Sequence, residues 1–366
     1  MMTDDLHDRL AALTRAAAHD GDGESEPFRV SDGALKGFAP AAFGALDALA
    51  QTITRHRNER RAQAQRQSRQ TFGIELGAGS AKLFAKQWTQ DAPAQTIVDV
   101  KLRLVRRTGT PDTERAYRNQ IEHILAAFAT HTRTDHLVPP QHIAFDAPER
   151  LRAACPPDTD VLYVYGTQGP RESTRSSGPL FPRTLRLLTG DEEARLMFDA
   201  IVPPESRHPG AMSIEIGTGS TELALIDAAG RQQTITFQLG AARQDPLAAI
   251  AKAIATTDIT PAVDHLEGPA SSAATFLTES RRTNLRLYIN PNKQSAGMRD
   301  QTRPAPGTPI PLATIARYAT DQTAPKAKIL ATLAQAFALT TIHEGTKGGL
   351  KKAMAQFVGR ALVKRA

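Results

Sequence analysis

Two stretches of the chain repeat one strand–loop–strand pattern, and this repeat limits the fold more than any other feature. The first is "FGIELGAGSAKLF", residues 72–84, and the second is "SIEIGTGSTEL", residues 213–223. In each, an alternating apolar run ends in a loop of glycine and hydroxyl residues, and a second alternating run follows, as in a β-hairpin. The interval from Glu75 to Glu215 is 140 residues. We therefore expect two similar lobes that face one ligand.

The rest of the chain alternates strand patterns with helical patterns, which is typical of an α/β protein. Strands are predicted over residues 94–107, 161–167 and 233–243, and helices over residues 112–131, 190–202, 244–257, 327–342 and 348–365. Residues 260–325 are rich in Pro, Ser and Thr and are predicted to be irregular. We expect a helical, basic N-terminal extension (1–70), a first lobe (71–205), a second lobe (206–340) and a C-terminal helix (341–366).

The chain carries a net charge of +7, which favours anionic partners such as phosphate polymers, nucleotides or nucleic acid. Part of that charge lies in the predicted extension, at Arg55, Arg57, Arg60, Arg61, Arg66 and Arg69. This run could be a solvated helix face or an arm that contacts a polyanion or an acidic partner. The apolar segment "AAFGALDALA" just before it would suit a homodimer interface or packing on the chain's own body. The sequence leaves these alternatives open.

A cytoplasmic location is expected. The chain has one cysteine, Cys155, which excludes an internal disulfide framework and fits a reducing compartment. No run reaches the roughly 18 apolar residues of a membrane helix, and the first residues are too acidic to begin a signal peptide. We therefore expect no membrane contact.

The two loops have the composition of phosphate-binding loops. Glycine has no Cβ, so the backbone amides of such a turn can approach an anion closely, and hydroxyls add further donors. Carboxylates there would repel phosphate unless a divalent cation lay between them, which makes Glu75, Glu215 and Glu222 candidate Mg²⁺ ligands. The candidate phosphate-binding residues are Gly77, Gly79, Ser80, Lys82, Gly217, Gly219, Ser220 and Thr221.

The stretch "TGDEEARLMF", residues 189–198, has two interpretations. Asp191, Glu192 and Glu193 would stabilise the positive N-terminal end of a helix, and Arg195 would balance them. A carboxylate close to the phosphate loops could instead take a proton from a water that attacks phosphorus. The residues alone favour the capped helix.

Together these segments resemble a known family. "IELGAGSAKL", "YGTQGPRES", "TGDEEARLMF", "IEIGTGSTELAL" and "FQLGAAR" follow the order and spacing of the exopolyphosphatase and guanosine pentaphosphate phosphohydrolase family. The resemblance covers roughly residues 71–355 and is most specific from Gly190 to Arg243. It implies an actin-like α/β fold, in which two lobes enclose a phosphate-binding cleft.

The resemblance also implies roles for single residues. Glu193 matches the family's base for the attacking water, and Arg171 matches an arginine that steadies a charged oxygen. Ser80 and its neighbouring glycines match the first phosphate loop, and residues 217–222 match the second phosphate and metal loop. The implied reaction is Mg²⁺-assisted hydrolysis that releases terminal orthophosphate from polyphosphate or a phosphorylated guanosine nucleotide. We favour polyphosphate, because the chain is basic and shows no obvious base-stacking pocket.

The sequence departs from the family pattern at the loops. Glu75 and Glu215 stand where the family usually has aspartate, and Thr218 stands where it usually has glycine. These changes fit either a matched re-tuning of an active site or a protein that binds without cleaving, and we favour retained activity. The alternatives are a catalytically weak sensor of a phosphorylated ligand and an actin-like ATPase.

Overall fold

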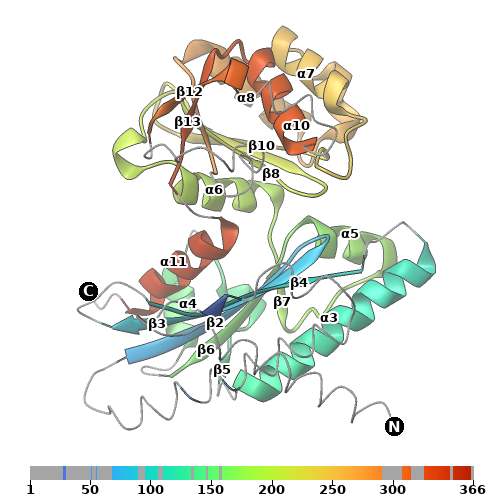
Figure 1. Ribbon diagram of the computed structural model, residues 1–366, viewed down its shortest axis with the longest axis vertical. Helices are drawn as coiled ribbons and strands as arrows, with labels where there is room; N and C mark the ends of the chain where they lie inside the picture. Colours follow the sequence, from blue (N-terminus) through green and yellow to red (C-terminus); the bar gives the residue numbers. More distant parts are fainter. Residues whose placement is uncertain are drawn as a thin grey trace. The chain divides into compact units, whose positions relative to one another are not determined.

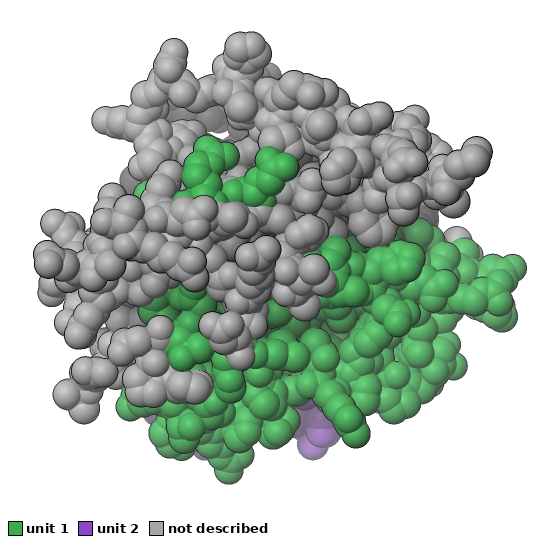
Figure 2. All heavy atoms as spheres, turned by 90° about the horizontal axis from the view of Figure 1, so that it is seen from below, with its two compact units in different colours: residues 1–187, 355–366 green, residues 188–354 purple. Residues whose placement is uncertain are grey.

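The computed structural model describes residues 28–29, 51, 55, 68–89, 95–105, 110–132, 136–145, 147–155, 159–290, 307–314, 325–346 and 349–363. The chain divides into two compact units, residues 1–187 with 355–366 (unit 1) and residues 188–354 (unit 2) (Figures 1 and 2). The second division falls inside helix α11 (Leu350–Val363), so the end of the chain completes unit 1. Most of the predicted basic arm lies outside the described residues.

Unit 1 is built on a mixed sheet with the strand order β1-β4-β3-β2-β6-β5, and β7 also pairs with β6. Its strands are β1 (Phe28–Arg29), β2 (Ser68–Leu76), β3 (Ser80–Thr89), β4 (Gln95–Arg103), β5 (His136–Leu137), β6 (Val161–Gly166) and β7 (Leu185–Leu187). Strands β2, β3 and β4 are antiparallel, whereas β6 runs parallel to β2. The first predicted hairpin is therefore the centre of this sheet.

Helices cover both faces of the unit 1 sheet (Figure 1). On one face lies α3 (Pro111–Thr132), whose buried side chains recur every three or four residues as an amphipathic helix requires: Tyr117, Ile121, Ile124 and Phe128. On the other face, α11 packs with Gly359 against the Trp88 ring. Helix α4 (Pro148–Ala154) contacts α11, because Arg152 Nε donates to the carbonyl of Ala361 at 2.8 Å.

Unit 2 repeats this plan with the strand order β10-β9-β8-β11-β13-β12. Its strands are β8 (Ala211–Ile216), β9 (Thr221–Ile226), β10 (Gln232–Phe237), β11 (Arg286–Ile289), β12 (Pro309–Pro311) and β13 (Thr341–Glu344). Strands β8, β9 and β10 are antiparallel, and β11 and β13 continue the sheet in parallel with β8. The second predicted hairpin, β8–β9, lies in the interior of this sheet.

Helices also divide between the two faces of the unit 2 sheet (Figure 1). One face carries the larger apolar core, to which α7 (Leu247–Thr256), α8 (Ala270–Arg282) and α10 (Pro325–Ala336) contribute. Helix α6 (Gly190–Ile201) lies on the other face, against β8, β9 and β10. Among the described residues, no helix is both long and apolar enough to span a bilayer.

The two units share one topology. Each sheet contains three consecutive antiparallel strands, and parallel strands extend it beyond the first of the three, as in the ribonuclease H-like lobes of actin-like proteins; unit 1 adds the short β1, parallel to β4, at the other edge. The predicted actin-like α/β fold is therefore confirmed.

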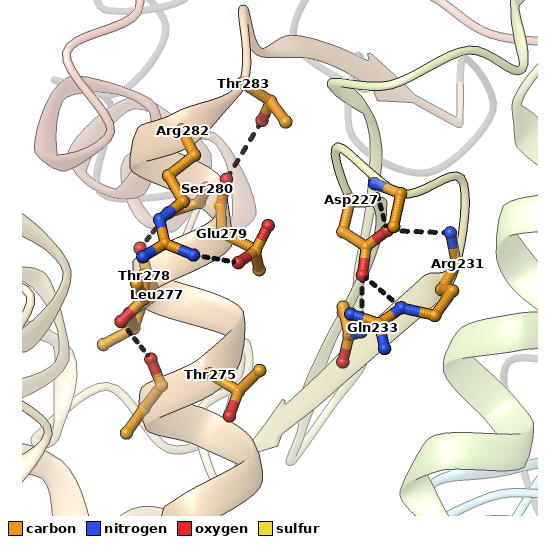
Figure 3. Close-up of polar contacts among 12 residues, drawn as sticks. Asp227, Arg231, Gln233, Thr275, Leu277, Thr278, Glu279, Ser280, Arg282 and Thr283 are labelled. Atoms are coloured by element: carbon orange, nitrogen blue, oxygen red, sulfur yellow. Dashed lines mark hydrogen bonds and ion pairs between the residues drawn. The ribbon is translucent and has the colours of Figure 1, made fainter.

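One predicted region is more regular than its composition suggested. Residues 260–325 were expected to be irregular, yet they contain α8, β11 and β12. In α8 the buried residues Ala273, Phe276, Leu277 and Ser280 follow helical spacing, and Arg282 pairs with Glu279 at 2.9 Å (Figure 3). The abundance of Ser and Thr hid this spacing, so the expectation was wrong for these three elements.

The turn between β9 and β10 is held by one buried carboxylate. Asp227 accepts hydrogen bonds from the backbone amides of Ala229 and Arg231 and from the side chains of Arg231 and Gln233 (Figure 3). Burial opposes ionisation of Asp227, but the bonds from Gln233 and Arg231 outweigh it and lower its pKa. The turn fixes the register of β10 against β9.

Candidate functional site

The two predicted loops adopt the same turn. In unit 1 the amide of Gly77 donates to the carbonyl of Ser80 at 2.8 Å, and in unit 2 the amide of Gly217 donates to the carbonyl of Ser220 at 2.8 Å. The flanking strands remain in register on both sides, with Leu76 opposite Ala81 and Ile216 opposite Thr221. The repeat seen in the sequence is therefore a repeat in backbone geometry.

The unit 1 loop rests on the first turn of α5 (Gln168–Ser177). A Cβ built on Gly169 would lie 2.4 Å from Cα of Ala78, so only glycine allows this approach. The Tyr117 hydroxyl donates to the carbonyl of Gly77 at 2.9 Å, and the Leu104 amide donates to the carbonyl of Gly79 at 3.1 Å. Contacts with Gly169, Tyr117 and Leu104 thus fix the loop within unit 1 without a ligand.

The unit 2 loop rests on the segment that follows β10. The amide of Ala241 donates to the carbonyl of Gly217 at 3.1 Å, and the amide of Ala242 donates to the carbonyl of Thr218 at 2.8 Å. A Cβ on Gly240 would lie 2.5 Å from the amide nitrogen of Gly219. Each loop therefore has its own supporting glycine, Gly169 in unit 1 and Gly240 in unit 2.

Glu75, expected as a Mg²⁺ ligand, is instead bound to protein groups on both of its oxygens. Its Oε1 forms an ion pair with Lys82, directly opposite on β3, and its Oε2 accepts from the Tyr165 hydroxyl at 3.1 Å. Lys101 follows opposite Lys82 on β4. The residues of this row therefore suit anion binding through Lys82 and do not fit metal binding through Glu75.

The matching row in unit 2 has the opposite character. Glu215 lies opposite Glu222, and Glu222 lies opposite Thr236 on β10. Side chains directly opposite each other in an antiparallel pair share one face, with Cβ atoms about 4.5–5.5 Å apart. We call Glu215, Glu222 and Thr236 the acidic row. All three are buried, at 3%, 2% and 0% exposure, so solvent screens the repulsion of the two carboxylates poorly.

Two hydroxyls near the acidic row are used inside the protein. Ser220 Oγ donates to Glu222 Oε1, and Thr221 Oγ1 donates to the carbonyl of Leu239 at 2.7 Å. Thr221 is fully buried, so its hydroxyl anchors the strand end to the supporting segment. Lys326, in the first turn of α10, donates to the carbonyl of Ile216 beside the loop.

Glu193 lies on the helix that covers the acidic row. Helix α6 begins with a capping box between Thr189 and Glu192, which confirms the capped helix predicted from "TGDEEARLMF". Gly190 packs on Thr236, since a Cβ at residue 190 would lie 2.5 Å from Thr236 Oγ1. Glu193 is buried and follows Gly190 by three residues, so it shares the helix face that meets the row. Capping and placement of Glu193 are therefore compatible.

Arg171 lies in unit 1 on α5, the helix that supports the first loop. Its amide donates to the carbonyl of Thr167 at 3.1 Å, and its side chain is buried. Glu75, Lys82, Ser80 and Arg171 belong to unit 1, and Glu193, Glu215, Ser220 and Glu222 belong to unit 2. That both loops face one ligand stays a prediction.

The donor set in unit 2 fits Mg²⁺. In the described part of the chain no group of three or more His, Cys, Asp or Glu side chains could hold a metal ion. Mg²⁺, however, is usually bound through one or two carboxylates, with phosphates and waters as its other ligands. Glu215 and Glu222 supply such a pair, and a divalent cation would relieve their mutual repulsion.

Two residues next to the candidate glutamates, Tyr165 and Thr236, were not predicted from the sequence. Both are identified by counting residues across strand pairs, since Tyr165 lies opposite Glu75 and Thr236 lies opposite Glu222. The alternation within β2 and β8 was visible in the sequence, but the registers with β6 and β10 were not. Without these registers, neither residue stands out from an ordinary strand.

No protein-family model and no curated protein matches this sequence. Solved structures similar to it include the PPX-GPPA enzyme of Aquifex aeolicus, at 13% identity and a TM-score of 0.47, over 79% of this chain and 99% of that one. An exopolyphosphatase from Cytophaga hutchinsonii has 12% identity and a TM-score of 0.46, over 81% and 100%. The ethanolamine utilization protein EutJ of Carboxydothermus hydrogenoformans has 12% identity and a TM-score of 0.30, over 81% and 90%.

Proposed function

We propose that this protein is a Mg²⁺-dependent phosphohydrolase of the exopolyphosphatase and guanosine pentaphosphate phosphohydrolase family. The observation that carries the proposal is the acidic row of unit 2, which lies beside a supported glycine–serine turn and beneath the helix that bears Glu193. A fold of this kind hosts many activities, so the residues of this site, and not the topology, point to the function.

The loops supply the phosphate contacts. Each turn presents backbone amides around a glycine, and each is fixed by neighbouring backbone before ligand binding. Fixed donors stabilise developing negative charge without the cost of reorganisation during reaction. In unit 1, Lys82 adds a positive charge whose position is set by Glu75, and Arg171 is proposed to neutralise a charged oxygen.

Glu215 and Glu222 are proposed to hold the Mg²⁺ ion. Such an ion neutralises phosphate oxygens and would let an anionic chain lie near buried carboxylates. Glu193 is proposed to be the base. Its carboxylate takes a proton from a water whose oxygen forms the new bond to phosphorus. The bond to the bridging oxygen then breaks, and its electron pair leaves on the shortened phosphate chain.

We propose inorganic polyphosphate as the substrate and a guanosine tetra- or pentaphosphate-type nucleotide as the second choice. A polymer of phosphate needs cationic and amide contacts only, and the net charge of +7 favours it. A nucleotide would also need a base pocket, and neither loop carries an aromatic residue.

The test is phosphate release from medium-length polyphosphate with Mg²⁺, with Glu193→Gln compared with the wild type. Removal of a general base should lower the rate about 10²–10⁴-fold. Glu192→Gln is the matched control, because it makes the same chemical change one residue away and glutamine also completes a capping box. Its rate should stay close to that of the wild type. No release by the wild type, or equal rates for wild type and Glu193→Gln, would contradict the proposal.

A second candidate function is a sensor that binds a phosphorylated ligand without cleaving it. The ion pair of Glu75 with Lys82 favours it, because Glu75 is then unsuited to hold a cation. Calorimetry that finds micromolar polyphosphate binding, together with turnover no faster than background, would support the sensor. Turnover well above background would rule it out.

We also propose a cytoplasmic location. The lone cysteine, Cys155, is buried, and burial raises the pKa of its thiol to about 11. A thiol of this kind is inert and fits a protein that needs no disulfide.

A further inference from the structure

The hydroxyl group of Thr236, in the acidic row, has no hydrogen-bond partner within the described structure. Thr236 is fully buried, and its Oγ1 makes no hydrogen bond. A buried hydroxyl without a partner costs roughly 1–3 kcal/mol, so such groups are rare. Two hydroxyls on the adjoining strands β9 and β10 do have partners, since Thr234 Oγ1 donates to Asp191 at 2.9 Å and Thr221 Oγ1 donates to the carbonyl of Leu239. The exception therefore needs an explanation.

The position of Thr236 shows which group could become its partner. It is the third member of the acidic row, directly opposite Glu222, which is itself opposite Glu215. Its hydroxyl thus lies on the sheet face shared by both carboxylates. Valine fills the same volume and favours strands equally well, so packing alone gives no reason for a hydroxyl here.

The start of α6 leaves room for this hydroxyl. A Cβ on residue 190 would lie 2.5 Å from Thr236 Oγ1 and 2.8 Å from its Cβ, so a side chain at this position would displace it. Gly190 therefore keeps the hydroxyl in place, and Glu193 follows one helical turn later on the same face. Thr236 is thus next to Glu222 in the acidic row and in contact with the start of the helix that bears the proposed base.

We propose that Thr236 is a positioning residue of the unit 2 cation site, and that its hydroxyl binds a water of the hydration shell of the divalent ion held by Glu215 and Glu222. Mg²⁺ keeps several of its waters when bound to proteins, so the site needs groups that hold water as well as groups that hold the ion. Thr236 orients that water towards Glu193. This inference rests on the proposed function for its role in hydrolysis, but not for its role in cation binding.

The test compares Thr236→Val with the wild type by calorimetric titration. Mn²⁺ or Mg²⁺ is added to each protein without substrate, and the cation affinity is measured. Loss of an outer-shell partner should weaken cation affinity about 10-fold or more. Thr236→Ser keeps the hydroxyl and should bind the ion within about 2-fold of the wild type, since one methyl group changes packing only. Thr234→Val, the same change two residues away, should bind the ion as the wild type does.

Thermal unfolding separates this role from a structural one. Without divalent ions, Thr236→Val should be at least as stable as the wild type, because it removes a buried hydroxyl that has no partner. With saturating ion, the rise in Tm should be smaller for the variant. Equal cation affinities for Thr236→Val and the wild type would overturn the inference, as would a wild type that binds no divalent ion. A wild type that binds the ion with Thr236-dependent affinity, yet releases no phosphate, would refute the proposed function and leave this inference standing.

Discussion

Glu75 and Glu215 hold matching positions at the ends of β2 and β8, yet their neighbours give them different roles. The residue opposite Glu75 is Lys82, and the residue opposite Glu215 is Glu222. A carboxylate paired with a lysine is neutralised by it, whereas two facing carboxylates repel each other and suit a shared cation. The difference between the units thus depends on one position, the seventh residue after each glutamate.

This difference predicts unequal effects of one substitution at two sites. Glu215→Gln should weaken Mn²⁺ binding at least 10-fold, because it removes one of the two proposed charged ligands. Glu75→Gln should leave the Mn²⁺ affinity within about 2-fold and should instead release Lys82, since an amide holds a lysine less strongly than a carboxylate does. Calorimetric titration of both variants measures the contrast. Equal loss of affinity in both would mean that Glu75 also serves the ion.

At the scale of elements, each loop depends on a glycine far from it in sequence. Gly169 and Gly240 allow their segments to touch the first and second loop, and the added Cβ of an alanine would lie 2.4 Å and 2.5 Å from loop backbone. Backbone cannot yield as a flexible side chain can. Gly79, within the first loop, has nothing within 4 Å of an added Cβ.

We therefore predict that Gly169→Ala and Gly240→Ala lower the free energy of unfolding by about 1–3 kcal/mol, as overpacking usually does. Both should also slow the proposed phosphate release, since the loop amides move. Gly79→Ala should leave the stability unchanged or raise it slightly, because alanine restricts the unfolded chain. Urea unfolding of the three variants checks this. If Gly240→Ala were as stable as the wild type, residue 240 would not lie as close to the backbone of Gly219 as the structure has it.

Some helices and strands could be predicted from the sequence, but the pairing between distant strands could not. Hairpins β2–β3 and β8–β9 and helices α3 and α6 follow from strict periodicity and from caps, which are local signals. The partners of Glu75 and Glu222 in β6 and β10 depend on strand register, which long connections set. Thr236 and Tyr165 were missed for this reason, although the turn between the strands of each hairpin was predicted where the structure has it.

For the whole molecule, α11 has a particular importance, because the division between the units falls inside it. Two contacts fix its final part to unit 1. Arg152 donates to the carbonyl of Ala361, and the ring centroids of Phe145 and Phe357 lie 4.7 Å apart. Gly359 packs against the ring of Trp88, whose Nε1 donates to Thr71 Oγ1 at 2.9 Å. Removal of this contact should loosen the end of the chain from the sheet.

Two intrinsic probes report on that contact. Trp88 is the only tryptophan of the chain, so its emission follows its own surroundings. Cys155 is the only cysteine, and burial raises the pKa of its thiol from 9.0 to about 11, while Arg69 lowers it less. The thiol is therefore protonated and unreactive at pH 8 in the folded protein. Because the folded pKa is the higher one, this group favours folding below about pH 9, and that contribution is lost as the pH rises towards 11.

Gly359→Ala places a Cβ 2.0 Å from the Trp88 ring, so either the ring or the helix must move. We predict a lower Tm, a red-shifted Trp88 emission and faster labelling of Cys155 by a thiol reagent at pH 8, because all three depend on docking of α11 on unit 1. Gly349→Ala, just before the helix, is the control, since its nearest neighbour would be Asn290 Nδ2 at an ordinary 3.6 Å. Wild-type emission and labelling in Gly359→Ala would mean that α11 does not dock on Trp88, and that the end of the chain contributes nothing to the stability of unit 1.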